Sequence, residues 1–256
     1  MNHINSKQLI CVMLLLTGGV LTSACFNEGQ TDGTKPVVND SAVIADTLDT
    51  IIATDTISDE DSLEDYARYE ELTDKDFEKV AKELDVEVAA MKAVVVIEAG
   101  KAMKGFCAPG VPIVNFDRVM YNKYKSKAKN KAGDKNQKVP KGLTGHALKE
   151  WTELVDARKQ NYEGANMGTF WGMFQIGGFN YKLCGCQSVD EFVKRMAYSE
   201  LEQLQLFALF ITNTGMLDSL RQKNWAAFAR KYNGPSYAKR GYHTKMAKAY
   251  ARYSAS

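Results

Sequence analysis

The residue best suited to catalysis is Glu98, which ends the apolar run "VVVIE". Ala99 and Gly100 follow it, and a glycine at this place stops a helix rather than extending it. Apolar neighbours and the negative end of a helix dipole both raise the pKa of a carboxyl group. A carboxyl that keeps its proton near neutral pH can act as the general acid of glycoside hydrolysis. The alternative, judged from this stretch alone, is an exposed glutamate at a helix end.

Two later stretches carry side chains that suit a sugar polymer. In "FWGMFQIGGFN", Trp171 and Phe174 offer flat apolar rings, and Gln175 offers an amide that can bridge polar groups. Aromatic packing around a glycine-rich turn is the alternative for this stretch. In "KYNGP", Tyr232 and Asn233 stand just before a helix-ending Gly-Pro pair. Helix termination would explain the Asn-Gly-Pro order, but it would not by itself require the tyrosine.

Apolar spacing predicts a mainly α domain that positions these residues, with a small non-helical lobe. Capping boxes at Thr73 and Ser188, and Asn224 as a cap, mark helix starts. The stretch 107–124 is broken by Pro and Gly and predicts strands or irregular segments, and the lysine-rich stretch 123–138 predicts a loop. The expected helices cover residues 72–84, 86–98, 147–159, 189–197, 201–213, 216–223, 225–232 and 242–254.

Charge divides the chain of 256 residues into two unlike parts. Residues 26–65 contain eleven acidic residues and only Lys35 as a base, whereas residues 66–256 carry a net charge of +11. The acidic part is poor in aromatic residues, so it predicts a flexible tether over residues 25–70. The basic part, residues 71–256, has the length of one globular domain and suits an anionic partner. Nucleic acid and bacterial wall material both meet that description.

The first residues indicate the compartment. Lys7 precedes the apolar stretch "LICVMLLLTGGVL", and small residues then lead into Cys25, so residues 1–24 predict a signal peptide. The sequence "LTSAC" resembles the lipobox of bacterial lipoproteins, in which the cysteine is lipidated; a plain secretory signal cut near Ala24 is the alternative. We therefore expect an exported, membrane-anchored lipoprotein that faces the cell wall, periplasmic or associated with the outer membrane. Export argues against nucleic acid as the partner.

Three cysteines remain after the signal peptide and Cys25, namely Cys107, Cys184 and Cys186. Cys184 and Cys186 are too close for an easy mutual disulfide, so the choices are one bridge from Cys107 or three buried thiols. No zinc-ligand spacing occurs, and the three histidines are scattered. We expect no metal and no cofactor.

Four stretches in order resemble the N-acetylmuramidases typical of modular phage endolysins, which belong to the lysozyme-like superfamily. They are "IEAGKAMKGF", "PIVNFDRV", "FWGMFQIGGFN" and "WAAFARKYNGP", and the resemblance covers roughly residues 75–253. It implies an α+β lysozyme-like fold and a monomeric glycoside hydrolase that acts on peptidoglycan glycan strands. Glu98 would be the general acid in cutting the β-1,4 bond between N-acetylmuramic acid and N-acetylglucosamine. Gln175, Tyr232 and Asn233 would line the substrate cleft, with Trp171 and Phe174 as packing or platform residues.

The sequence also departs from this family. Ala99 replaces a serine, and Asp117 stands where the family has a second glutamate, so Asp117 is a doubtful second carboxylate that either positions water or braces Arg118. A lytic transglycosylase, which needs no second carboxylate, is therefore one alternative. A non-catalytic wall-binding lipoprotein is another, and a secreted nucleic-acid binder is the most distant.

Overall fold

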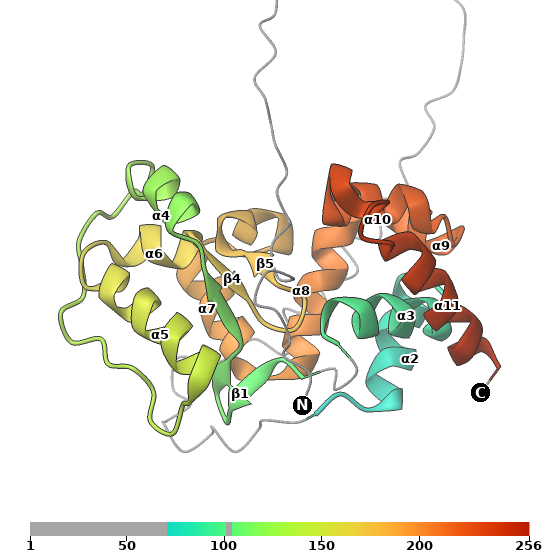
Figure 1. Ribbon diagram of the computed structural model, residues 1–256, viewed down its shortest axis with the longest axis horizontal. Helices are drawn as coiled ribbons and strands as arrows, with labels where there is room; N and C mark the ends of the chain where they lie inside the picture. Colours follow the sequence, from blue (N-terminus) through green and yellow to red (C-terminus); the bar gives the residue numbers. More distant parts are fainter. Residues whose placement is uncertain (1–70, 101–103, 256) are drawn as a thin grey trace, which may run out of the picture.

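The computed structural model describes residues 71–100 and 104–255, and most of this part of the chain is helical (Figure 1). The predicted signal peptide, Cys25 and the whole predicted tether over residues 25–70 lie outside the described residues. The α-helices are α2 (Asp74–Glu83), α3 (Val88–Glu98), α4 (Arg118–Lys125), α5 (Gly145–Arg158), α6 (Tyr162–Met167), α7 (Val189–Tyr198), α8 (Glu200–Asn213), α9 (Leu217–Arg221), α10 (Trp225–Asn233) and α11 (Tyr242–Ser254). Two 3₁₀ helices, η2 (Gly178–Cys184) and η3 (Pro235–Tyr237), complete the helical elements.

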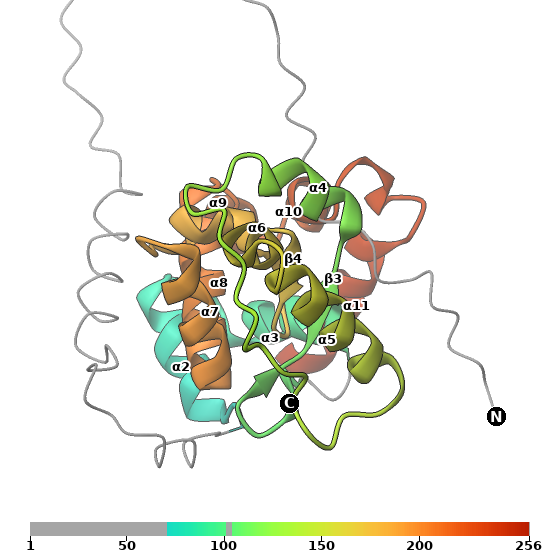
Figure 2. The same cartoon turned by 90° about the vertical axis from the view of Figure 1, so that its left-hand side faces the viewer.

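Helix α8 lies between two groups of elements (Figure 1). On one side are α4, α5, α6 and the strands; on the other are α3, α9, α10 and α11, with α3 packed along α11. In the view turned by 90°, α4 and α5 lie nearest the viewer, and α3 and α11 lie behind them (Figure 2). Nearly every residue of α8 is buried, because its sequence is apolar on most sides.

The predicted capping residues Thr73 and Ser188 both begin helices, but only one of the two predicted capping boxes is complete. Thr73 caps α2 with a complete capping box, in which its side chain and that of Asp76 bind each other's backbone N–H. Ser188 accepts the N–H of Glu191 at 3.1 Å at the start of α7. The glutamate carboxylate binds the N–H of Gln187 instead of that of Ser188, so this box is incomplete.

Two small antiparallel sheets form the non-helical part. Strand β1 (Phe106–Ala108) pairs with β2 (Val111–Pro112). The second sheet has the order β3-β4-β5, built from β3 (Val114–Phe116), β4 (Thr169–Trp171) and β5 (Ile176–Gly177). In register, Val114 lies opposite Trp171 and Phe116 lies opposite Thr169, so the sheet joins two stretches that are far apart in sequence.

The prediction of strands or irregular segments for 107–124 is correct for its first part and wrong for its second. Residues after Phe116 form helix α4, because Asp117 acts as its N-cap and Met120 and Tyr121 give it a buried face. Helix α6 was not predicted either. It is only six residues long, too short for an apolar period to be recognised, and Asn161 caps it.

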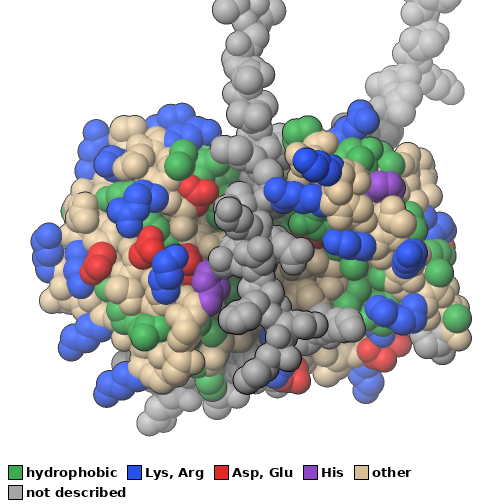
Figure 3. Space-filling model, viewed as in Figure 1, with side chains coloured by type: hydrophobic (Ala, Val, Ile, Leu, Met, Phe, Trp, Pro, Cys, Tyr) green, Lys and Arg blue, Asp and Glu red, His purple; other side chains and the backbone are tan. Residues whose placement is uncertain are grey.

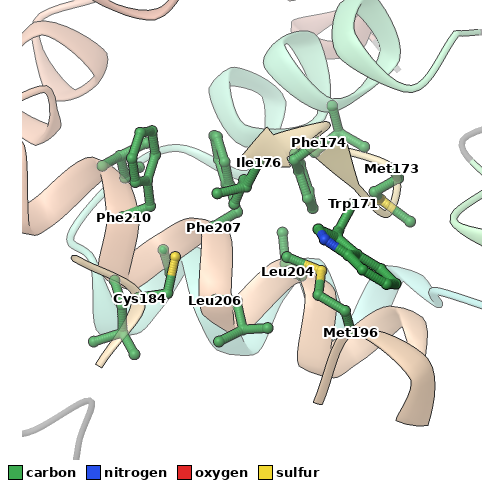
Figure 4. Close-up of a cluster of buried hydrophobic side chains, with 14 of the residues drawn as sticks. Trp171, Met173, Phe174, Ile176, Cys184, Met196, Leu204, Leu206, Phe207 and Phe210 are labelled. Carbon is green, nitrogen blue, oxygen red and sulfur yellow. The ribbon is translucent and has the colours of Figure 1, made fainter. Parts of the chain in front are cut away.

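The core is centred on the contact between α8 and the β4–β5 region (Figure 4). Phe174 stacks on Phe207 of α8, with ring centroids 4.2 Å apart. The edge of Phe207 meets the ring of Tyr232 from α10, at 5.8 Å between centroids. One continuous aromatic cluster therefore connects the β4–β5 turn, α8 and α10.

Lys and Arg side chains are spread over both ends of the face shown in Figure 3, with fewer Asp and Glu between them. Within residues 71–100 and 104–255, none of the helices has both the length and the apolar character that a bilayer-spanning segment needs.

Candidate active site

Glu98 is the last residue of α3, and its side chain is partly buried. The helix ends there because Ala99 makes the final bond, from its N–H to the carbonyl of Val95 at 2.8 Å, and Gly100 then takes φ +78°. That backbone angle is strained for residues with a side chain. The sequence thus ends the helix at the residue whose carboxyl is expected to do chemistry.

Asn233, the last residue of α10, is the hydrogen-bond partner of Glu98. Its Nδ2 donates to Glu98 Oε1 at 2.9 Å, and its own side chain is only 3% exposed. Burial among apolar residues raises the pKa of Glu98 from 4.5 to about 7, while the bond from Asn233 acts in the opposite direction. The carboxyl can therefore hold or release a proton near neutral pH. The Oδ1 of Asn233 is buried and has no partner among the described residues.

Tyr232 is next to Asn233 but turns into the core. Its hydroxyl donates to the carbonyl of Phe174 at 2.6 Å, and the residue is 1% exposed. Burial raises the pKa of this phenol well above its usual value. In this arrangement the hydroxyl is already engaged, so Tyr232 connects α10 to the β4–β5 turn and presents no polar atom to solvent.

Gln175 lies in the tight turn between β4 and β5. Its backbone has φ +49°, a left-handed angle that is uncommon for a residue with a side chain and that clusters at functional sites. Its Nε2 donates to the carbonyl of Gly172 at 2.8 Å. Its Oε1 is buried without a partner in the described structure, so one acceptor remains for another polar group.

Trp171 and Phe174 are fully buried, each with 0% exposure. The indole N–H of Trp171 donates to the carbonyl of Asn166 at 3.1 Å, and its ring meets the edge of Trp151. A platform for a sugar needs an exposed ring face, which neither residue has here. Trp171 and Phe174 were predicted to be either packing or platform residues, and in this structure both pack in the core.

Asp117 serves α4. Its Oδ1 accepts the N–H of Met120 at 2.9 Å, and its own N–H donates to the carbonyl of Gly168 at 3.1 Å. Of the two roles left open for Asp117, the bracing of Arg118 is not what the structure has, because Arg118 binds Glu153 Oε2 at 3.3 Å. The observed role of Asp117 is that of a helix cap, and the positioning of water stays a prediction.

The three cysteines described are all free thiols. Cys184 and Cys186 are buried and burial raises the pKa of both, as expected for structural thiols, whereas Cys107 is exposed. The picture of three buried thiols is thus wrong for Cys107, which projects from strand β1. No group of three or more His, Cys, Asp or Glu residues suited to a metal ion occurs in the described part of the chain.

Sequence reasoning missed two buried polar residues, Glu200 and Gln203. Glu200 accepts the N–H of Gly105 at 2.7 Å and the N–H of Leu72 at 3.0 Å. Gln203 accepts the N–H of Met173 at 2.8 Å. Polar residues three apart within the apolar stretch "SELEQLQLFALFI" were the available signal, because such residues are buried only with partners.

A mainly α fold with two small antiparallel sheets, and a partly buried carboxyl whose pKa is raised to about 7, are features of lysozyme-like glycosidases. The family model of the N-acetylmuramidases matches residues 87–254, and the chain belongs to this family. The crystal structure of a Burkholderia AP3 phage endolysin is similar, with 30% sequence identity and a TM-score of 0.61 over 84% of this chain and 87% of that one. No curated protein matches the chain. Family and fold together support a peptidoglycan hydrolase.

Proposed function

We propose that the protein cuts the β-1,4 bond between N-acetylmuramic acid and N-acetylglucosamine, with Glu98 as the general acid. One observation carries this proposal: a carboxyl with a pKa of about 7 at the end of α3, held by the amide of Asn233. A general acid works best when its pKa lies near the working pH, and such groups typically accelerate a step by about 10²- to 10⁴-fold.

In the proposed reaction the protonated Glu98 donates its proton to the glycosidic oxygen as the bond to the anomeric carbon breaks. Water then adds to that oxocarbenium-like carbon and loses one proton, and the ionised Glu98 takes up a proton again so that the cycle closes. Asn233 suits both states of Glu98, since Nδ2 can donate to the carboxylate, and Oδ1 is an unoccupied acceptor for the protonated form if the amide rotates. The unpaired Oε1 of Gln175 is offered to a substrate hydroxyl or amide N–H.

The second candidate is a lytic transglycosylase, in which the substrate's own 6-hydroxyl attacks instead of water. The position of Asp117 favours it, because one oxygen of that carboxylate is occupied in capping α4. An enzyme with Glu98 as its single carboxylate needs an internal nucleophile or a water held by other groups.

Mass spectrometry of the fragments released from purified peptidoglycan separates the two reactions. Hydrolysis of the proposed bond predicts fragments with a reducing N-acetylmuramic acid end. A product set made only of 1,6-anhydro ends would replace the hydrolase with the transglycosylase. Reducing ends on N-acetylglucosamine would contradict the proposed bond.

We also propose that the enzyme is a monomer that works outside the cytoplasm on a lipid anchor at Cys25, at the end of the tether over residues 25–70. The lipobox-like "LTSAC" and the acidic composition of 26–65 support this. The expected outcome is that Cys25→Ser moves the protein from the membrane fraction to the soluble extracytoplasmic fraction. Unchanged membrane association of that variant would contradict a lipid anchor.

A further inference from the structure

Helix α8 buries several polar residues among its apolar ones, and two of them, Glu200 and Gln203, bind segments near the candidate site. Glu200 is 1% exposed and Gln203 is 0% exposed, and the two lie one turn apart on the same face. Burying a carboxylate and an amide is costly unless both are fully hydrogen-bonded. Each of them therefore needs partners, and those partners come from the segments around the candidate site.

Glu200 is bonded entirely to backbone. One oxygen accepts the N–H of Gly105 and the other accepts the N–H of Leu72, at 2.7 and 3.0 Å. Gly105 belongs to the stretch "IEAGKAMKGF" and lies seven residues after Glu98. Its carbonyl in turn accepts the N–H of Ile113 at 2.8 Å. Gly105 is thus fixed to the start of α8 at the point where the chain enters strand β1.

Gln203 binds the backbone of the β4–β5 turn. Its Oε1 accepts the N–H of Met173 at 2.8 Å, and its Nε2 donates to the carbonyls of Met196 at 2.8 Å and Gly105 at 3.4 Å. Glycine is needed at both neighbouring positions. A Cβ on Gly105 would lie 2.2 Å from the amide oxygen of Gln203, and one on Gly172 would lie 2.5 Å from it.

These bonds connect α8 to the hydrogen-bond partner of Glu98. Gln203 binds Met173, and the carbonyl of the next residue, Phe174, accepts the hydroxyl of Tyr232. Asn233, the residue after Tyr232, binds Glu98. Helix α8 therefore holds Gly105 directly, and it holds the partner of Glu98 through the β4–β5 turn and α10. The side-chain oxygens of Glu200 and the amide of Gln203 all have partners, and buried polar groups satisfied in this way fix the segments that they join.

We infer that Glu200 and Gln203 are positioning residues for Glu98, which set the carboxyl and its Asn233 partner in the geometry that the reaction requires. This inference rests on the proposed function of Glu98. Displacement of a catalytic group by about 1 Å can lower the rate about 10²-fold, so the loss of these bonds should act on the chemical step.

The test compares Glu200→Gln and Gln203→Met with the control Glu202→Gln. Glu202 is also a buried α8 carboxylate, but its side chain binds Arg195 at 2.6 Å, whereas Glu200 and Gln203 bind Gly105 and Met173. Rates on soluble glycan strands are measured well below the unfolding temperature of each variant. The positioning role predicts a fall in kcat of at least about tenfold for Glu200→Gln and Gln203→Met, with KM changed less than about twofold. Glu202→Gln should lower the unfolding temperature and leave kcat as it is.

A titration of the Glu98 carboxyl carbon by NMR gives a readout that does not require turnover. In Glu200→Gln and Gln203→Met the midpoint should move down towards that of an ordinary glutamate, because looser segments admit water; in Glu202→Gln it should not move. If wild-type protein releases no fragments but these shifts occur, the proposed function fails and the positioning role stands. If all three variants lose only stability, with kcat and the midpoint unchanged, the positioning role is overturned.

Discussion

At the scale of single residues, the account depends on one carboxyl group whose surroundings shift its protonation. Glu98 is placed at the end of a helix with an apolar sequence, so burial outweighs the stabilising bond from Asn233 and the pKa rises to about 7. The same surroundings make the ionised form unfavourable in the folded protein. Function and stability should therefore both depend on pH through this residue.

Replacing Glu98 by Gln should change how stability depends on pH. Between about pH 4.5 and 7 the folded protein retains a proton on Glu98 that the unfolded chain has released, so wild-type stability falls as pH rises through this range. Glutamine does not titrate. The free energy of unfolding of Glu98→Gln, relative to that of the wild type, should therefore rise by about 1–3 kcal/mol between pH 4 and pH 8. Urea unfolding at several pH values measures the difference. A difference independent of pH would mean that the pKa of Glu98 is not raised.

At the scale of elements, the candidate site residues lie at the ends of helices, and hydrogen bonds connect these helix ends to other segments. Glu98 and Asn233 end α3 and α10, Asp117 begins α4, and the hydroxyl of Tyr232 connects α10 to the β4–β5 turn. Tyr232 and Asp117 each hold another backbone segment in the structure, through the carbonyl of Phe174 and the N–H of Met120. Their substitution should affect stability more than turnover.

Asp117 provides a direct comparison between a cap and a catalyst. Asn also caps helices well, so Asp117→Asn should keep both stability and the rate per folded molecule, whereas Asp117→Ala should lose about 1 kcal/mol of stability. Thermal unfolding and wall-digestion rates check the two variants. A loss of about 100-fold in rate for Asp117→Asn, with stability unchanged, would restore the second-carboxylate role.

Tyr232 can be tested by removing only its hydroxyl. Tyr232→Phe leaves the buried carbonyl of Phe174 without its bond, so stability should fall by about 1–2 kcal/mol. The ring still packs against Phe207 and Phe228, and KM for glycan strands should stay near the wild-type value. A rise in KM without a change in stability would show instead that the hydroxyl contacts substrate.

At the scale of the whole molecule, local patterns were predictable and long-range contacts were not. The longer helices, several caps and the end of α3 at Glu98 follow from residues close in sequence and were predicted, whereas the short helices α4 and α6 were not. The bond from Asn233 to Glu98 joins residues 135 positions apart, and the bond from Gly105 to Glu200 joins residues 95 apart. No periodic pattern encodes such pairs. The same limit explains why a buried Trp171 was open to interpretation as a sugar platform.

The central claim is that Glu98 donates the proton when the glycan bond breaks. The most direct measurement is the initial rate at which purified peptidoglycan is cut, for the wild type and Glu98→Gln at pH 6, with Glu87→Gln at the opposite end of α3 as the control. The account predicts a loss of at least about 100-fold for Glu98→Gln in a folded protein, and a control rate like the wild type. Retention of the wild-type rate by Glu98→Gln would contradict the account.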